Sequence, residues 1–71
     1  MGYAAMRIYL FRSASGSRTF AYTLDVTGRI IARETEHAEW LYMRVLDAEE
    51  LEGRPEVLQQ LRADGFYLFN D

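Results

Sequence analysis

Apolar residues come in short alternating runs between clusters of turn-forming residues, a pattern typical of a small antiparallel sheet. Residues 7–12 are β-branched and aromatic and predict a first strand, which stops at the small polar residues 13–17. Residues 18–24 alternate polar and apolar and predict the return strand of a hairpin. A second turn at 25–28, with Asp first and Gly last, leads to a short third strand predicted over 29–32.

The middle of the chain is the most ambiguous part of the pattern. Residues 33–39 are polar and unpatterned, which predicts a loop or a frayed helical turn. Residues 40–46 fit a strand with Leu41, Met43 and Val45 directed inward. A helix continuing from residue 34 is the alternative, but apolar residues at 40–43 would surround such a helix instead of forming a stripe along it.

The C-terminal part contains clear helix signals. Residues 47–50 have the spacing of a capping box and predict a helical turn from Ala48. Pro55 suits the first position of a helix, and Gly65 suits the left-handed residue that ends one. Residues 66–69 then predict a final strand. The buried stripe of this helix is expected to consist of Val57, Leu58 and Leu61.

Together these elements predict an α+β fold. We expect a small antiparallel β-sheet, built as a meander of β-hairpins plus further strands, with one main C-terminal helix packed on one face. A chain of 71 residues has room for one core, so residues 6–71 are expected to form a single domain. Residues 1–5 are expected to be a leader or a disordered N-terminus.

With these elements placed, the chain resembles the YcgL family of small bacterial proteins. The similarity lies in short apolar patterns spread along most of the chain, at residues 8–9, 12–13, 19–22, 46–47 and 65–68. The resemblance implies an α+β sheet with a helix on one side, and it implies no activity. Residues 25–39, with an extra turn and an acidic loop, do not match the family pattern.

Composition narrows the class of protein further. The chain has no Cys, a single His and no apolar run long enough to cross a bilayer, so we expect a cytoplasmic protein without metal or cofactor. All eight basic residues are Arg, which suggests a bacterial source. No catalytic motif surrounds any Ser, so an enzyme is not expected.

Two polar clusters have residues that could form binding sites. Ser13, Ser15 and Ser17 around Gly16 can form an anion-binding turn, although a hairpin loop needs the same small residues. His37 lies among glutamates, where a solvated loop is a better interpretation than a weak metal site.

The aromatic residues predict an interaction surface. In the first strand Ile8 and Leu10 share one face while Tyr9 and Phe11 share the other, so both faces need a cover although only one main helix is predicted. We therefore expect a protein-interaction module, self-associating as a homodimer through the helix-free face. Its predicted anchors are Tyr9, Phe11, Trp40 and Tyr42. The alternative is that residues 33–39 fold over this face.

The distribution of charge predicts a second function. Five Arg and one acidic residue precede residue 34, whereas ten acidic residues and three Arg follow. An N-terminal hairpin rich in Arg and aromatic residues can bind single-stranded nucleic acid, with possible polyanion contacts at Arg7, Arg12, Arg18 and Arg29. The net charge of −3 weakens long-range attraction to such a ligand.

Overall fold

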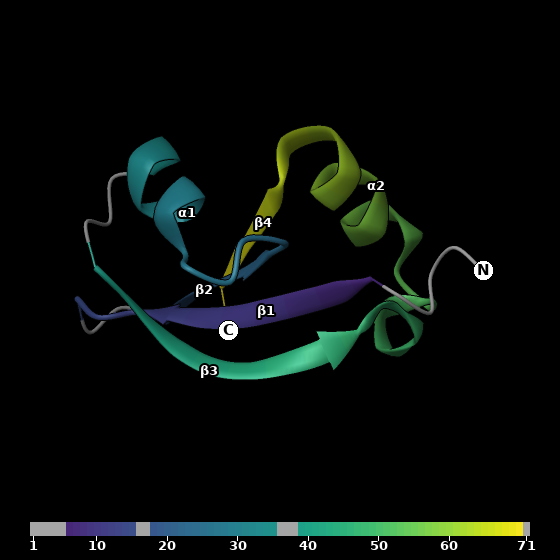
Figure 1. The fold of residues 1–71 in the computed structure, drawn as a ribbon, viewed down its shortest axis with the longest axis horizontal. Helices are drawn as coiled ribbons and strands as arrows, with labels where there is room; N and C mark the ends of the chain where they lie inside the picture. The colour runs from purple at the N-terminus through teal and green to yellow at the C-terminus, as the bar shows by residue number, and fades with distance from the viewer. Residues whose placement is uncertain (1–5, 16–17, 36–38, 71) are drawn as a thin grey trace.

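The computed structural model describes residues 6–15, 18–35 and 39–70, and the predicted leader at 1–5 lies outside them. Four strands and three short helices follow one another along the described chain (Figure 1). In chain order they are β1 (Arg7–Ser13), β2 (Thr19–Thr23), α1 (Arg29–Glu34), β3 (Trp40–Asp47), the 3-10 helix η2 (Ala48–Leu51), α2 (Pro55–Asp64) and β4 (Phe66–Asn70).

The strands form one antiparallel sheet in the order β3-β1-β2-β4. The predicted α+β class, with one main helix near the C-terminus, is confirmed. Because β1 and β2 lie in the centre, β3 and β4 are the two edge strands.

The prediction of a third strand over residues 29–32 is wrong, because these residues belong to α1. Gly28 precedes the helix with φ 72°, a left-handed conformation that turns the chain out of the sheet. Ile31 is fully buried beside Phe11 and Ala21 in an apolar cluster on the sheet. Packing of this helical turn therefore overrides the strand propensity of two consecutive isoleucines.

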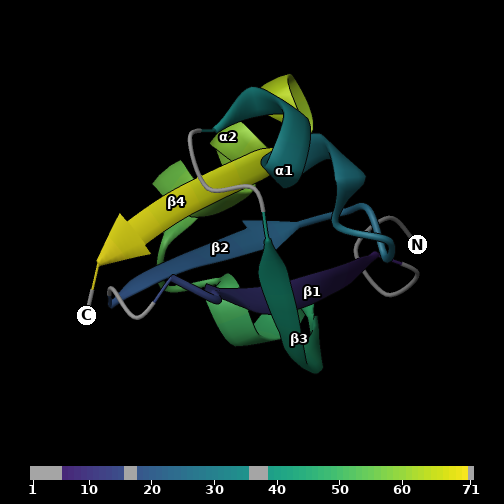
Figure 2. The ribbon, with the colours of Figure 1, turned by 90° about the vertical axis from the view of Figure 1, so that its left-hand side faces the viewer.

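Two apolar clusters lie on opposite faces of the sheet. On β1, Ile8 packs with Val57 and Leu61 of α2, whereas Phe11 packs with Ile31 of α1. Since successive side chains of a strand alternate, these contacts place α1 and α2 on opposite faces. Figure 2 agrees, with α1 in front of β4 and α2 behind it. We call these the α1 face and the α2 face, and the expectation of a helix-free face is wrong.

Residues 40–46 form a strand, as predicted, but their predicted orientation is wrong. Leu41, Met43 and Val45 are 46%, 48% and 39% exposed. Leu10 is opposite Arg44 while Phe11 is opposite Tyr42, so Met43 is an extra residue in a β-bulge. The bulge breaks the simple alternation along β3, and residues 41–45 in the middle of this edge strand are exposed.

The C-terminal predictions are confirmed. Asp47 and Glu50 form a capping box at the start of η2, and Pro55 occupies the first turn of α2. Gly65 ends α2 with φ 87°, and β4 follows directly. Val57, Leu58 and Leu61 are buried as expected.

Candidate interaction surface

The structure divides the four predicted aromatic anchors between a covered and an open region. Phe11 is only 4% exposed, and Trp40 is half-buried beside the same α1 cluster. Tyr9 is also half-buried, whereas Tyr42 is 54% exposed. Helix α1 therefore buries Phe11, which is not available to a partner, and Tyr42 is the accessible member of the set.

Tyr42 lies where the covered part of the α1 face meets its open part. Its ring centroid is 5.8 Å from that of Phe11, in an edge-to-face arrangement, and 6.5 Å from that of Tyr9. Edge-to-face packing of this kind adds favourable contact energy and restricts the ring. Tyr42 is thus held in place on its inner side while its outer side remains exposed.

Exposed apolar side chains continue along β3 on both sides of Tyr42. Val45 is opposite Tyr9 and lies on the α1 face, whereas Leu41 is opposite Arg12 and lies on the α2 face. We call this set the β3 patch, and its members are Leu41, Tyr42, Met43 and Val45. Only Tyr42 was predicted as a contact residue, because the bulge that exposes the others leaves no signal in the sequence.

One ion pair borders the β3 patch. Arg44 contacts Glu50 of η2 at 3.4 Å, and the second carboxylate oxygen of Glu50 accepts a hydrogen bond from the Asp47 amide at 3.2 Å. Both partners of the pair are substantially exposed, so the pair contributes little to stability. Its effect is to draw the Arg44 charge toward η2 at one end of the patch.

The four predicted polyanion contacts do not form one surface. Arg7, Arg12, Arg18 and Arg29 are all exposed. Arg7 and Arg12 differ by an odd number of positions along β1 and therefore lie on opposite faces. Arg29 begins α1, and Arg18 immediately precedes β2. The structure places Arg12 and Arg18 at the same end of the sheet and separates Arg7 from them.

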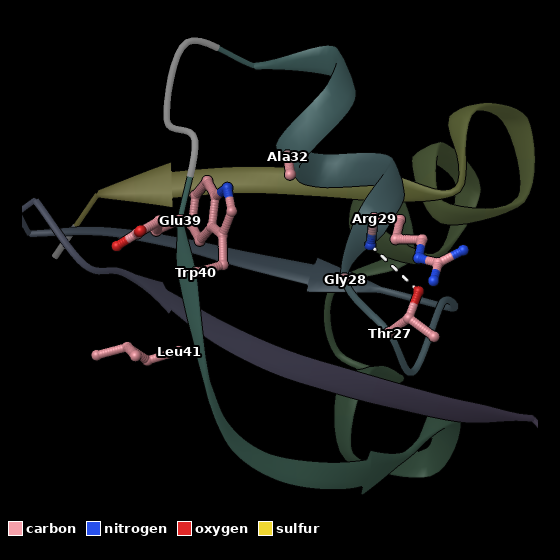
Figure 3. A pocket seen from close by; sticks show the side chains of 7 residues that line it. All are labelled: Thr27, Gly28, Arg29, Ala32, Glu39, Trp40 and Leu41. Carbon is pink, nitrogen blue, oxygen red and sulfur yellow. Dashed lines mark hydrogen bonds between the residues drawn. The ribbon is translucent and has the colours of Figure 1, made fainter.

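A shallow open groove lies between the start of α1 and the start of β3 (Figure 3). Its volume is about 380 Å³. The residues that line it are Thr27, Gly28, Arg29, Ala32, Glu39, Trp40 and Leu41. In Figure 3 the side chains of Trp40 and Leu41 leave β3 in different directions. The described residues that line the groove include one acidic side chain, Glu39, and one hydroxyl, that of Thr27.

The two polar clusters of the sequence are only partly described. Ser13 is buried, and its hydroxyl lies 2.8 Å from that of Ser15 and accepts a hydrogen bond from the Ser15 amide at 3.2 Å. These bonds are those of a local turn. Gly16, Ser17 and His37 lie outside the described residues. Within the described ranges, no three His, Cys, Asp or Glu side chains are grouped in a way that could hold a metal ion.

The pKa of the Asp25 carboxyl group is lowered, and the cause is structural. The Thr27 hydroxyl donates to its carboxylate at 2.6 Å and holds its pKa below the ordinary value. The amides of Thr27 and Ile30 also donate to this carboxylate, at 2.9 Å and 3.2 Å. Asp25 thereby joins the turn after β2 to the first turn of α1.

Comparison with known proteins gives no indication of function. No family model, no curated protein and no solved structure matches the chain. The resemblance to the YcgL family therefore stays a prediction. None of the helices in the described part of the chain is long and apolar enough to span a bilayer.

Proposed function

We propose that this protein is a small protein-interaction module that self-associates as a homodimer through β3. The observation that carries the proposal is the concentration of exposed apolar side chains on one strand. Of the seven large apolar residues exposed among those described, four are the β3 patch. An exposed apolar patch of this kind is typical of an interface.

The backbone of β3 supports the same proposal. Within the described sheet β3 pairs with β1 on one side only, so its outer edge presents main-chain donors and acceptors. Natural edge strands are often protected by Lys or Pro, and β3 contains neither residue over its eight positions. The protective features that β3 does have are the bulge at Met43 and the exposed charge of Arg44 beside it.

A second copy of the chain is the partner that fits best. Two copies of an edge strand pair antiparallel about a two-fold axis, so each patch covers its own equivalent. Residues of β3 contribute to both sheet faces, so such a pairing buries Tyr42 and Val45 on one face and Leu41 on the other. A small domain without disulfides gains stability from this additional burial.

Sedimentation equilibrium across a range of protein concentrations tests this proposal. We expect a reversible monomer–dimer equilibrium at micromolar concentration, consistent with a modest interface of about 800 Å² per partner. A strict monomer over the whole range would contradict it. A larger open-ended assembly would contradict the two-fold arrangement.

A further inference from the structure

The α2 face is covered by helix at one end only. Ile8 and Leu46 lie beneath α2 and η2, at the start of β1 and the end of β3. At the other end of the sheet, one row of side chains runs across all strands of the α2 face, because Arg12 is opposite both Leu41 and Phe20, and Phe20 is opposite Phe69. We call Leu41, Arg12, Phe20 and Phe69 the distal row. None of them belongs to a buried apolar cluster.

The aromatic members of this row form an ordered stack. Phe20 and Phe69 are 5.4 Å apart between centroids, with ring planes 19° from parallel. Tyr22 is two residues after Phe20 on β2 and therefore lies on the same face, and its ring stacks on that of Phe69 with 4.9 Å between centroids. The hydroxyl of Thr19 donates to the side-chain oxygen of Asn70 at 3.0 Å and joins β2 to β4 beside the stack. No helix lies over the row, and these rings are half-buried.

The charge around the distal row is locally basic. Arg12 lies within the row, and Arg18 immediately precedes the strand that carries Phe20. One acidic residue, Glu39, is at this end of the sheet, where its backbone carbonyl accepts a hydrogen bond from the Ala14 amide at 3.1 Å. Within the described residues, neither Arg12 nor Arg18 takes part in an ion pair.

A group of four acidic residues lies at the opposite end of the sheet. Glu49, Glu50, Glu52 and Glu56 surround η2 and the start of α2, which Figure 1 shows at the far end of β1 from the β1–β2 hairpin. The molecule is 37 Å long, whereas electrostatic screening acts over about 8 Å at physiological salt. The acidic end therefore does little to repel an anion at the distal row.

We infer that the distal row binds single-stranded nucleic acid. Bases stack on Phe20 and Phe69, as they do on exposed aromatic residues of other sheets, and Arg12 and Arg18 contact the phosphates. Charge complementarity favours this ligand over an apolar protein surface, because the aromatic stack is flanked by arginines. The site differs from the predicted one, since it excludes Arg7 and Arg29 and uses the α2 face.

Fluorescence anisotropy with a labelled oligothymidylate tests this inference, with salt raised from about 50 to 200 mM. We expect saturable binding that weakens with salt. Phe20→Leu and Phe69→Leu are each expected to weaken binding about tenfold, because each removes a stacking surface while keeping an apolar side chain. Arg12→Gln is expected to weaken binding. It is also expected to make the plot of log affinity against log salt less steep, by the amount that about one phosphate contact contributes.

Arg7→Gln is the matched control, because it removes the same charge from the other face and the other end of the sheet. Equal loss of affinity in Arg7→Gln and Arg12→Gln would overturn the site, and so would an absence of binding at low salt. Circular dichroism establishes that each variant is folded.

Amide chemical shifts of the wild-type protein give a readout that needs no variant. We expect oligothymidylate to move the signals of Phe20 and Phe69, and movement confined to other residues would overturn the inference.

The distal row and the proposed dimer are tested separately. If the row instead closes on a second copy, the signals of Phe20 and Phe69 move with protein concentration and not with oligothymidylate, and the inference is overturned. If sedimentation shows a monomer that binds oligothymidylate, the dimer fails while the inference holds.

Discussion

Gly28 lies directly on the ring of Phe11: a Cβ added to Gly28 would be 2.9 Å from Cε2 of Phe11. Gly28 is buried and adopts φ 72°, a conformation that a side chain makes unfavourable. The contact lets α1 begin in immediate contact with the sheet and bury Phe11. This close contact explains why α1 covers the sheet at Phe11, where the sequence predicted an open surface.

Replacement of Gly28 by alanine is therefore expected to destabilise the fold. The left-handed conformation alone costs about 1–2 kcal/mol for a residue with a Cβ, and displacement of the Phe11 ring adds to it. Urea denaturation followed by circular dichroism measures the loss. Gly53→Ala is the control, because nothing lies within 4 Å of the added Cβ, and its effect is expected to stay below about 0.5 kcal/mol. Equal effects of the two substitutions would contradict the described packing.

The Asp25 carboxylate is expected to make stability depend on pH. Its pKa is lowered in the folded state by the hydrogen bond from the Thr27 hydroxyl, so its contribution is present above the ordinary carboxyl pKa. That contribution is lost as the pH falls through the lowered pKa. Asp25→Asn is expected to cost about 1 kcal/mol at neutral pH and to cost progressively less under acid conditions. Unfolding free energies measured across this range test the sign, and a difference that grows in acid would contradict it.

The buried hydroxyl of Thr23 connects the end of β2 to the start of β4. It donates to the Gly65 carbonyl at 2.8 Å and accepts from the Asp25 amide at 3.1 Å. Thr23→Val is expected to destabilise the protein by about 1–3 kcal/mol, because the Asp25 amide loses this acceptor and the Gly65 carbonyl is left with the hydrogen bond from the Leu24 amide. The exposed hydrogen bond of Thr19 provides the comparison, and Thr19→Val is expected to change stability by less than about 0.5 kcal/mol in thermal denaturation. A larger loss in Thr19→Val would count against this interpretation.

The proposed dimer predicts a selective effect of charge on β3. Met43→Lys places a charge in the β3 patch of both copies and is expected to weaken self-association at least about tenfold. Val26→Lys adds the same charge at an exposed apolar position in the turn after β2, and it is expected to leave the equilibrium unchanged. Sedimentation equilibrium measures the dimer dissociation constant of both variants and of the wild-type protein. Similar weakening in both would point to a general effect of charge instead of an interface at β3.

The sequence predicted those elements whose signals are local. Pro55 and Gly65 specify the ends of α2 through backbone conformation alone, and the capping box of Asp47 and Glu50 acts within η2. The assignment of residues 29–32 failed because helix formation there depends on contact between Ile31 and Phe11, which are distant in sequence.

The candidate surfaces were harder to predict than the elements. The exposure of Leu41, Met43 and Val45 depends on a bulge and on an edge position, neither of which follows from alternation along one strand. The pairing of Phe20 with Phe69 depends on β4 joining β2, so the stack could not be assembled from the hairpin alone. Tyr42 could be predicted as a contact residue because it is an aromatic residue within a strand-like run.

Amide hydrogen exchange along β3 tests the central claim of self-association most directly. The amides on the outer edge of this strand have no partner strand within the described sheet, whereas those of the central β1 do. We predict that outward-facing amides of β3 exchange rapidly in dilute protein and become protected as the concentration rises, while protection in β1 stays constant. Rapid exchange of these amides at every concentration would contradict pairing through β3.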